Sequence, residues 1–142
     1  MRVVIDANTL ASGAIEKTPP SISGQIINAW SQKKAFELIV SEHTIAEVKN
    51  TLKDTYFADR LRNYQIGDFV LLLRRRGVVV TVKTHIRGIA THIQDDEVIA
   101  TAIDGNTQFI VTRDTGLLSV KAYRGIQIIH PYQFFYLIRR SL

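Results

Sequence analysis

Apolar and polar residues alternate along the chain in blocks that predict strands and helices in turn. Val3, Val4 and Ile5 form a continuous apolar run, which is typical of a central parallel strand that is covered on both faces. Four later β-branched or aromatic runs have the same character, and the longer blocks between them carry apolar residues at helical spacing. This alternation predicts parallel βαβ units around one sheet. The predicted strands span residues 2–6, 36–40, 78–82, 109–112 and 126–129.

Capping and breaking residues delimit the predicted helices. Ser21 or Ser23 caps a helix that runs to about residue 34, after a loop that contains two prolines, and Ser41 caps a helix that runs to about residue 54. A short helix and a longer one fill residues 56–76, and Asp95 or Asp96 opens a helix that stops at residue 105. Residues 114–119 form a tight turn or a single helical turn, and a C-terminal helix starts at residue 131.

Composition narrows the class of protein. With 142 residues, 46% of them hydrophobic and 22% charged, the chain predicts one globular domain over residues 1–142. It has no cysteine, which excludes disulfides, thiolate nucleophiles and cysteine-ligated metal sites and is consistent with a cytoplasmic location. No apolar run approaches the roughly 20 residues that cross a bilayer, so we expect no membrane insertion. The formal net charge of +5 favours a polyanionic partner.

Acidic residues follow the predicted strands. Right-handed crossovers make the strands parallel, so the segments after their carboxyl ends meet at one edge of the sheet, where ligands bind in open α/β folds. The acids that this topology brings to that edge are Asp6, Glu47, Asp95, Asp96 and Asp114.

Each acid alone also has a structural interpretation. Asp6 and Asp114 can cap turns, Glu47 can be a solvated helix residue, and one of Asp95 and Asp96 can be a helix cap. Together, however, clustered carboxylates raise one another's pKa unless a cation neutralises them. Oxygen ligands without histidine or cysteine favour Mg²⁺ or Mn²⁺, and such ions support phosphodiester hydrolysis by lowering the pKa of bound water.

Four segments resemble the motifs of the PIN-domain ribonucleases, in the order in which that family has them. They are VIDANTL at 4–10, SEHTIAEV at 41–48, DDEVIATA at 95–102 and IVTRD at 110–114. The resemblance implies a three-layer α/β/α sandwich around a five-stranded parallel sheet, cleavage of RNA with Mg²⁺ or Mn²⁺, and often a homodimer. Small members that resemble this chain are commonly VapC-like toxins of type II toxin–antitoxin systems, so an antitoxin protein is a possible partner.

The resemblance also implies roles for individual residues. Asp6, Glu47, Asp96 and Asp114 match the catalytic, metal-binding positions, with Asp95 as a possible ligand or neighbour of the metal. Asn8 and Thr112 would orient the carboxylates or water by hydrogen bonding.

Basic residues near the acids are candidates for binding the RNA backbone. Lys83 and Arg87, with His85 and His92, surround the loop that leads to Asp95, and Arg113 lies beside Asp114. Each of these is also consistent with ordinary solvent exposure. Aromatic residues of the last predicted helix exceed what one buried face needs, so a surplus can form a dimer or antitoxin contact.

Two alternatives remain open. One is a catalytically inactive PIN-like scaffold that binds RNA or protein. The other is a haloacid-dehalogenase-like phosphatase, because Asp6-Ala7-Asn8-Thr9 is one residue away from its Asp-x-Asp-x-Thr signature. Those enzymes use the second Asp of the signature as acid and base, a task that Asn8 cannot perform. The phosphatase interpretation also gives Glu47 no role.

Overall fold

A computed structural model describes residues 1–15, 18–90 and 93–142. Within these ranges six strands form one sheet in the order β3-β2-β1-β4-β6-β5. The first five strands of this order are parallel, and β5 pairs antiparallel with β6. The strands are β1 (Arg2–Ile5), β2 (Glu37–Val40), β3 (Val78–Val79), β4 (Phe109–Val111), β5 (Ala122–Tyr123) and β6 (Ile126–Ile129).

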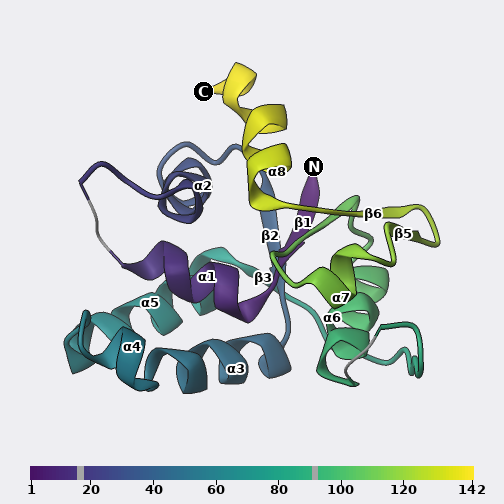
Figure 1. The fold of residues 1–142 in the computed structure, drawn as a ribbon, viewed down its shortest axis with the longest axis horizontal. Coiled ribbons are helices and arrows are strands. Elements are labelled where there is room, and N and C mark those ends of the chain that lie inside the picture. Colours follow the sequence, from purple (N-terminus) through teal and green to yellow (C-terminus); the bar gives the residue numbers. More distant parts are fainter. Residues whose placement is uncertain (16–17, 91–92) are drawn as a thin grey trace.

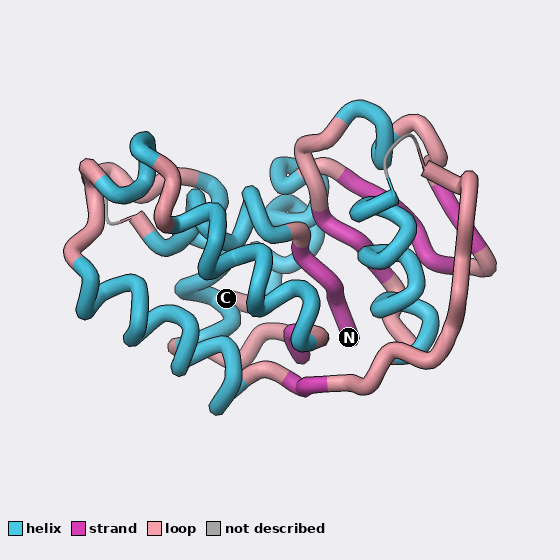
Figure 2. The backbone as a smooth tube through the Cα atoms, turned by 90° about the horizontal axis from the view of Figure 1, so that it is seen from below, coloured by secondary structure: helices cyan, strands magenta, loops and turns pink. Residues whose placement is uncertain are grey.

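Helices cover both faces of the sheet (Figures 1 and 2). One face packs against α1 (Ala7–Ala14), α2 (Ile22–Ser31), α3 (Glu42–Leu52), α5 (Asn63–Arg76) and α8 (Pro131–Ile138). The other face packs against α6 (Ile93–Asp104) and α7 (Thr115–Leu118). The short helix α4 (Thr55–Ala58) lies between α3 and α5, and a 3-10 turn, Arg139–Ser141, follows α8.

Side chains of the central strands alternate between the two layers, as strand geometry requires. In β1, Val3 and Ile5 enter the larger core cluster, and Val4 enters the smaller one. All three are at most 1% exposed. The five parallel strands predicted from the apolar runs, and the three-layer α/β/α fold implied by the resemblance, are therefore confirmed.

The structure differs from the predicted elements in detail. The third strand ends at Val79 instead of residue 82, because its partner β2 ends at Val40, which pairs with Val79. Helix α6 begins at Ile93, before the two acids that were expected to open it. The antiparallel strand β5 was not predicted.

Helix α1 is the largest difference, because residues 7–14 were expected in a loop. Asp6 is the cap of this helix: its Oδ1 accepts a hydrogen bond from the Thr9 backbone N–H at 3.0 Å. Leu10 and Ala11 face the core. The first strand thus turns directly into a helix at Asp6, which fixes this acid at the edge of the sheet.

None of the helices in the described ranges combines the length and the apolar character that crossing a bilayer needs.

Candidate active site

Four of the acids line one cavity of about 390 Å³ at the carboxyl edge of the parallel strands. They come from four separate segments: the end of β1, helix α3, the first turn of α6, and the segment between β4 and α7. We call this space the acidic cavity. Its lining residues are Asp6, Ala7, Asn8, Glu47, Asn50, Thr51, Asp95, Val98 and Asp114.

Asp6 and Asp114 are joined through Thr112. The hydroxyl of Thr112, which is fully buried, donates a hydrogen bond to Asp6 Oδ2. The Asp114 backbone N–H donates to the same hydroxyl oxygen at 3.0 Å. A hydroxyl has one proton, so this arrangement directs it to Asp6 and sets the orientation of that carboxylate.

Burial raises the pKa of Asp6, and the nearby charge of Asp114 raises it further, against the opposing hydrogen bonds from Thr112 and Thr9. The ionised form of Asp6 is therefore costly in the protein alone. A cation in the acidic cavity would lower that cost.

Asp114 caps α7, since its Oδ2 accepts a hydrogen bond from the Leu117 backbone N–H at 2.8 Å. Glu47 lies in α3, and its Oε1 is 3.0 Å from Nε2 of His43, one turn earlier on that helix. Asn50 and Thr51 lie on the same face of α3 as Glu47, three and four residues on, which is why they also line the cavity.

The adjacent acids Asp95 and Asp96 have different surroundings. Asp95 lines the acidic cavity. Asp96 is 4% exposed, does not belong to that lining, and accepts hydrogen bonds from the backbone N–H groups of Gly88 at 3.0 Å and Ala90 at 2.8 Å. Its carboxylate thus holds the loop before α6.

The donor set of the acidic cavity fits Mg²⁺ or Mn²⁺. Four carboxylates and the Asn8 and Asn50 amides supply oxygen donors, and the described residues that line it include no Lys or Arg. Across residues 1–15, 18–90 and 93–142, no three His, Asp or Glu side chains are close enough together to hold an ion directly. The carboxylates surround the cavity without meeting at one point.

The predicted RNA-binding residues are exposed and lie outside the lining of the acidic cavity. Arg87 lines a neighbouring cavity, and Lys83 lies in the segment that precedes it. Arg113 Nη2 is 3.3 Å from Ser23 Oγ on α2. Burial lowers the pKa of His130, and the positive charge of Arg113 lowers it further.

Sequence reasoning missed Asn50, Thr51 and His43. The signal for all three was their spacing from Glu47: positions i−4, i+3 and i+4 of a helix lie on one face. Asn8, which the sequence motifs indicate as a residue of the site, does line the acidic cavity.

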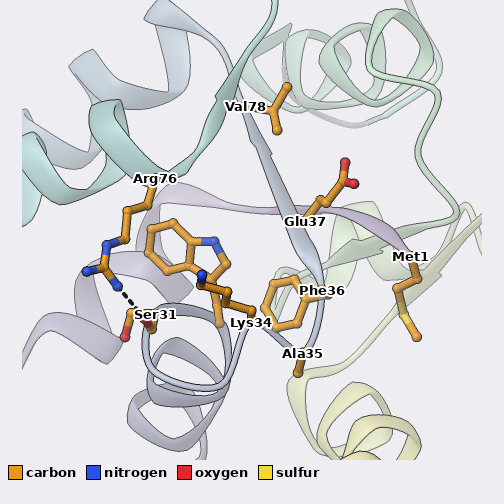
Figure 3. A pocket seen from close by; sticks show the side chains of 9 residues that line it. Met1, Ser31, Lys34, Ala35, Phe36, Glu37, Arg76 and Val78 are labelled. Carbon is orange, nitrogen blue, oxygen red and sulfur yellow. Dashed lines mark hydrogen bonds between the residues drawn. The ribbon is translucent and has the colours of Figure 1, made fainter.

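A larger cavity, of about 570 Å³, lies at the opposite, amino edge of the sheet (Figure 3). Arg76 there donates to the Ser31 carbonyl oxygen at 2.5 Å. Glu37, the one acid in its described lining, is paired with Arg2 at 2.7 Å. We call it the opposite cavity, and its lining residues are Met1, Trp30, Ser31, Lys34, Ala35, Phe36, Glu37, Arg76 and Val78. This cavity is a poor site for a divalent ion, because its one carboxylate is already paired and Lys34 and Arg76 lie beside it.

Comparison with known proteins agrees with the resemblance that the sequence motifs indicate. A search among curated proteins finds no match to the chain. The PIN domain family matches residues 2–116, which include β1, the four acids of the acidic cavity and α7 up to Gly116. PIN domains are generally nucleases that act on nucleic acid and use divalent metal ions. With this match over most of its length, the chain belongs to the PIN-domain family.

Proposed function

We propose that this chain is an endoribonuclease that hydrolyses RNA phosphodiester bonds with Mg²⁺ or Mn²⁺ in the acidic cavity. The observation that carries the proposal is the lining of that cavity, where four carboxylates from four distant segments border one space without a neutralising Lys or Arg among the described lining residues. The raised pKa of Asp6, caused by burial and then by Asp114, supports the same interpretation.

In this proposal Asp6, Glu47, Asp95 and Asp114 hold the metal, in part through water. A bound divalent ion at such a site lowers the pKa of water and neutralises charge that develops on a phosphodiester. Thr112 orients Asp6 through its hydroxyl proton, and the capping hydrogen bond from the Leu117 backbone N–H restrains the Asp114 carboxylate. Asn8 supplies an amide at the rim that can orient water or a carboxylate.

Asp95 takes the metal-binding role that the resemblance implies for Asp96. Asp96 is buried, lies outside the lining of the acidic cavity and accepts the hydrogen bonds from Gly88 and Ala90, so we assign it to positioning the loop before α6. This assignment keeps four acids at the site and changes which of the two neighbours serves as a ligand.

A cleavage assay tests the proposed function. Single-stranded and structured RNAs are incubated with the wild-type protein and Mg²⁺ or Mn²⁺, with EDTA as the metal-free arm, beside the Asp6→Asn variant. Asn retains the oxygen that caps α1 and removes the charge of Asp6, and the circular dichroism spectrum of the variant checks that it is folded. We expect cleavage by the wild type with metal only. Metal-independent cleavage, or an equally active Asp6→Asn variant, contradicts the proposal.

Titration calorimetry with Mn²⁺ separates this function from an inactive scaffold. Binding of Mn²⁺ without cleavage of any RNA indicates a scaffold. A covalent phosphoaspartate at Asp6 indicates the phosphatase alternative.

We further propose that the chain is the toxin of a toxin–antitoxin pair and forms a homodimer. Supporting features are exposed apolar residues on α8 that a protein partner can cover, namely Tyr132, Tyr136 and Leu137, which are 51–62% exposed. Expression of the wild type should arrest growth, and Asp6→Asn should not. Harmless expression of a wild-type protein that is active in vitro contradicts the toxin role.

A further inference from the structure

A second cavity adjoins the acidic cavity on the same two helices, and we call it the side cavity. It has a volume of about 360 Å³, at the lower end of the range for small-molecule pockets. Helices α3 and α6 supply one wall, and residues 82–87, which follow β3 and belong to no helix or strand, supply the other. The lining residues used below are His43, Val82, Ile86, Arg87, Glu97 and Ala100.

His43 connects the two cavities. It lies one helical turn, about 5.4 Å, before Glu47 on α3, and Glu97 follows Asp95 by two residues on α6. His43 Nε2 is 3.0 Å from Glu47 Oε1, and its Nδ1 is 2.6 Å from Glu97 Oε2. A ligand in the side cavity therefore lies within one helical turn of the proposed metal site.

The outer wall of the side cavity has a regular pattern. From residue 78 to residue 87 half-buried and exposed side chains alternate, as in an extended strand. Val82 and Ile86 turn inward, and the exposed positions between and after them carry Lys83, His85 and Arg87. At about 3.3 Å per residue these basic side chains recur about every 6.6 Å, which suits successive phosphates of an extended strand.

Asp104 holds this segment in place. Its carboxylate accepts hydrogen bonds from the backbone N–H groups of Lys83 at 2.6 Å and Thr84 at 2.9 Å, and from the Thr84 hydroxyl at 2.6 Å. The spacing of the basic side chains is therefore built into the fold.

We propose that the side cavity binds one unpaired nucleobase of a single-stranded RNA substrate, with a preference for guanine; this inference rests on the proposed nuclease function. The apolar walls at Val82, Ile86 and Ala100 suit the flat faces of a base, and Arg87 can stack on it or contact its phosphate. Glu97 is the one acid in the described lining, and its charge disfavours a phosphate inside the cavity.

Glu97 supplies the preference among bases. A carboxylate accepts hydrogen bonds only, at about four lone-pair positions, so the contact with His43 leaves acceptors for a ligand. Guanine presents an imino N–H and an amino group side by side on its Watson–Crick edge, which matches two carboxylate oxygens. Uracil presents a single N–H between two carbonyl oxygens, which a carboxylate repels.

Binding of nucleoside 5′-monophosphates in EDTA tests the subsite without relying on catalysis. The amide NMR spectrum of the protein is followed as GMP, AMP, CMP or UMP is added to the wild type, to Glu97→Gln and to Asp59→Asn. The last variant removes the same charge from an exposed position on the opposite side of the molecule, next to α4 (Figure 1). We expect GMP to bind the wild type and Asp59→Asn at least about 10-fold more tightly than UMP, and Glu97→Gln to lose most of this difference.

The inference is overturned if GMP and UMP bind equally, if Glu97→Gln retains the preference, or if about 10 mM GMP perturbs no resonance near His43 and Ala100. Mapping of cut sites in a random RNA with Mn²⁺ separates this result from the proposed function. Cuts without any nucleotide preference contradict the subsite and leave the nuclease intact. Preferential GMP binding without cleavage of any RNA contradicts the nuclease and leaves the subsite intact.

Discussion

The two edges of the sheet carry cavities of opposite character. The opposite cavity is larger, about 570 Å³ against about 390 Å³, and includes the mostly buried rings of Trp30 and Phe36. The acidic cavity is smaller and more polar, but it collects four carboxylates. Donor chemistry, and not volume, is therefore the basis of our proposal for the acidic cavity, because metal-assisted hydrolysis of a phosphodiester needs a divalent ion and its ligands.

Charge removal at the two edges should give the largest contrast. We expect Glu47→Gln and Asp114→Asn each to reduce RNA cleavage at least about 100-fold, because each removes a ligand of the metal. Glu37→Gln and Lys34→Ala in the opposite cavity should stay within about twofold of wild type, since they change only exposed charges. Initial cleavage rates measured on one RNA check this comparison. Similar losses at both edges would remove the distinction between the two cavities.

Metal binding should stabilise the protein through the acidic cavity alone. At a Mn²⁺ concentration about 100 times the dissociation constant, the free energy of unfolding should rise by about 2.7 kcal/mol for the wild type. Lys34→Ala should show the same increase, and Asp114→Asn should lose most of it. Urea unfolding with and without Mn²⁺ measures both changes, and an unchanged increase in Asp114→Asn would speak against the site.

The two neighbouring acids at the start of α6 should respond differently to substitution. Asp96→Asn replaces an acceptor of a backbone hydrogen bond by an amide donor, so we expect a loss of about 1–3 kcal/mol in the free energy of unfolding. Asp95→Asn should reduce RNA cleavage more than Asp96→Asn does, because Asp95 lines the acidic cavity and Asp96 does not. Urea unfolding and RNA cleavage of both variants provide the check, and the reverse ranking would return the ligand role to Asp96.

The smallest of these expected effects is a pH dependence of the free energy of unfolding that comes from Asp6. Folding raises the pKa of Asp6 above its ordinary value of 3.8, through burial first and Asp114 second. The folded protein therefore keeps this proton to higher pH than the unfolded chain does. Its contribution to stability is complete below the unfolded pKa and is lost as pH rises through the folded pKa.

Asn does not ionise, so the Asp6→Asn variant lacks the loss of stability that the ionisation of Asp6 causes as pH rises. Without metal, the melting temperature of the wild type should fall relative to that of Asp6→Asn as the pH rises from 4 to 7. Thermal unfolding of both proteins in EDTA between pH 4 and pH 7 measures it. A difference in melting temperature that stays constant between pH 4 and pH 7 would contradict the raised pKa of Asp6.

Much of this architecture was predictable from sequence because buried strands leave a strong signal. The run Val3–Ile5 is apolar on both faces because each face of β1 is covered by a helical layer. The same signal made the third predicted strand longer than β3, which ends at Val79. Residues 80–82 have strand propensity, but β2 ends at Val40 and Ser41 caps α3, so no partner strand remains beside them. Propensity reports the preference of a segment and not the presence of its neighbour.

Topology predicted the edge of the sheet at which four of the five acids line one cavity, and it did not predict the different surroundings of Asp95 and Asp96. Asp95 and Asp96 differ by about 100° around a helix of 3.6 residues per turn, so only one of them can face the acidic cavity. Which one does so depends on the loop that brings the N–H groups of Gly88 and Ala90 to Asp96. That loop has no periodic pattern, and its path follows from tertiary contacts.

Paramagnetic broadening by Mn²⁺ tests the central claim most directly, because it locates the ion on the protein. Substoichiometric Mn²⁺ is added to ¹⁵N-labelled wild-type protein and the amide resonances are followed at both edges of the sheet. The account predicts loss of signal around Asp6, Asn8 and Asp95, with the resonances of Lys34 and Glu37 retained. Broadening centred on the opposite cavity, or none at either edge, would contradict it.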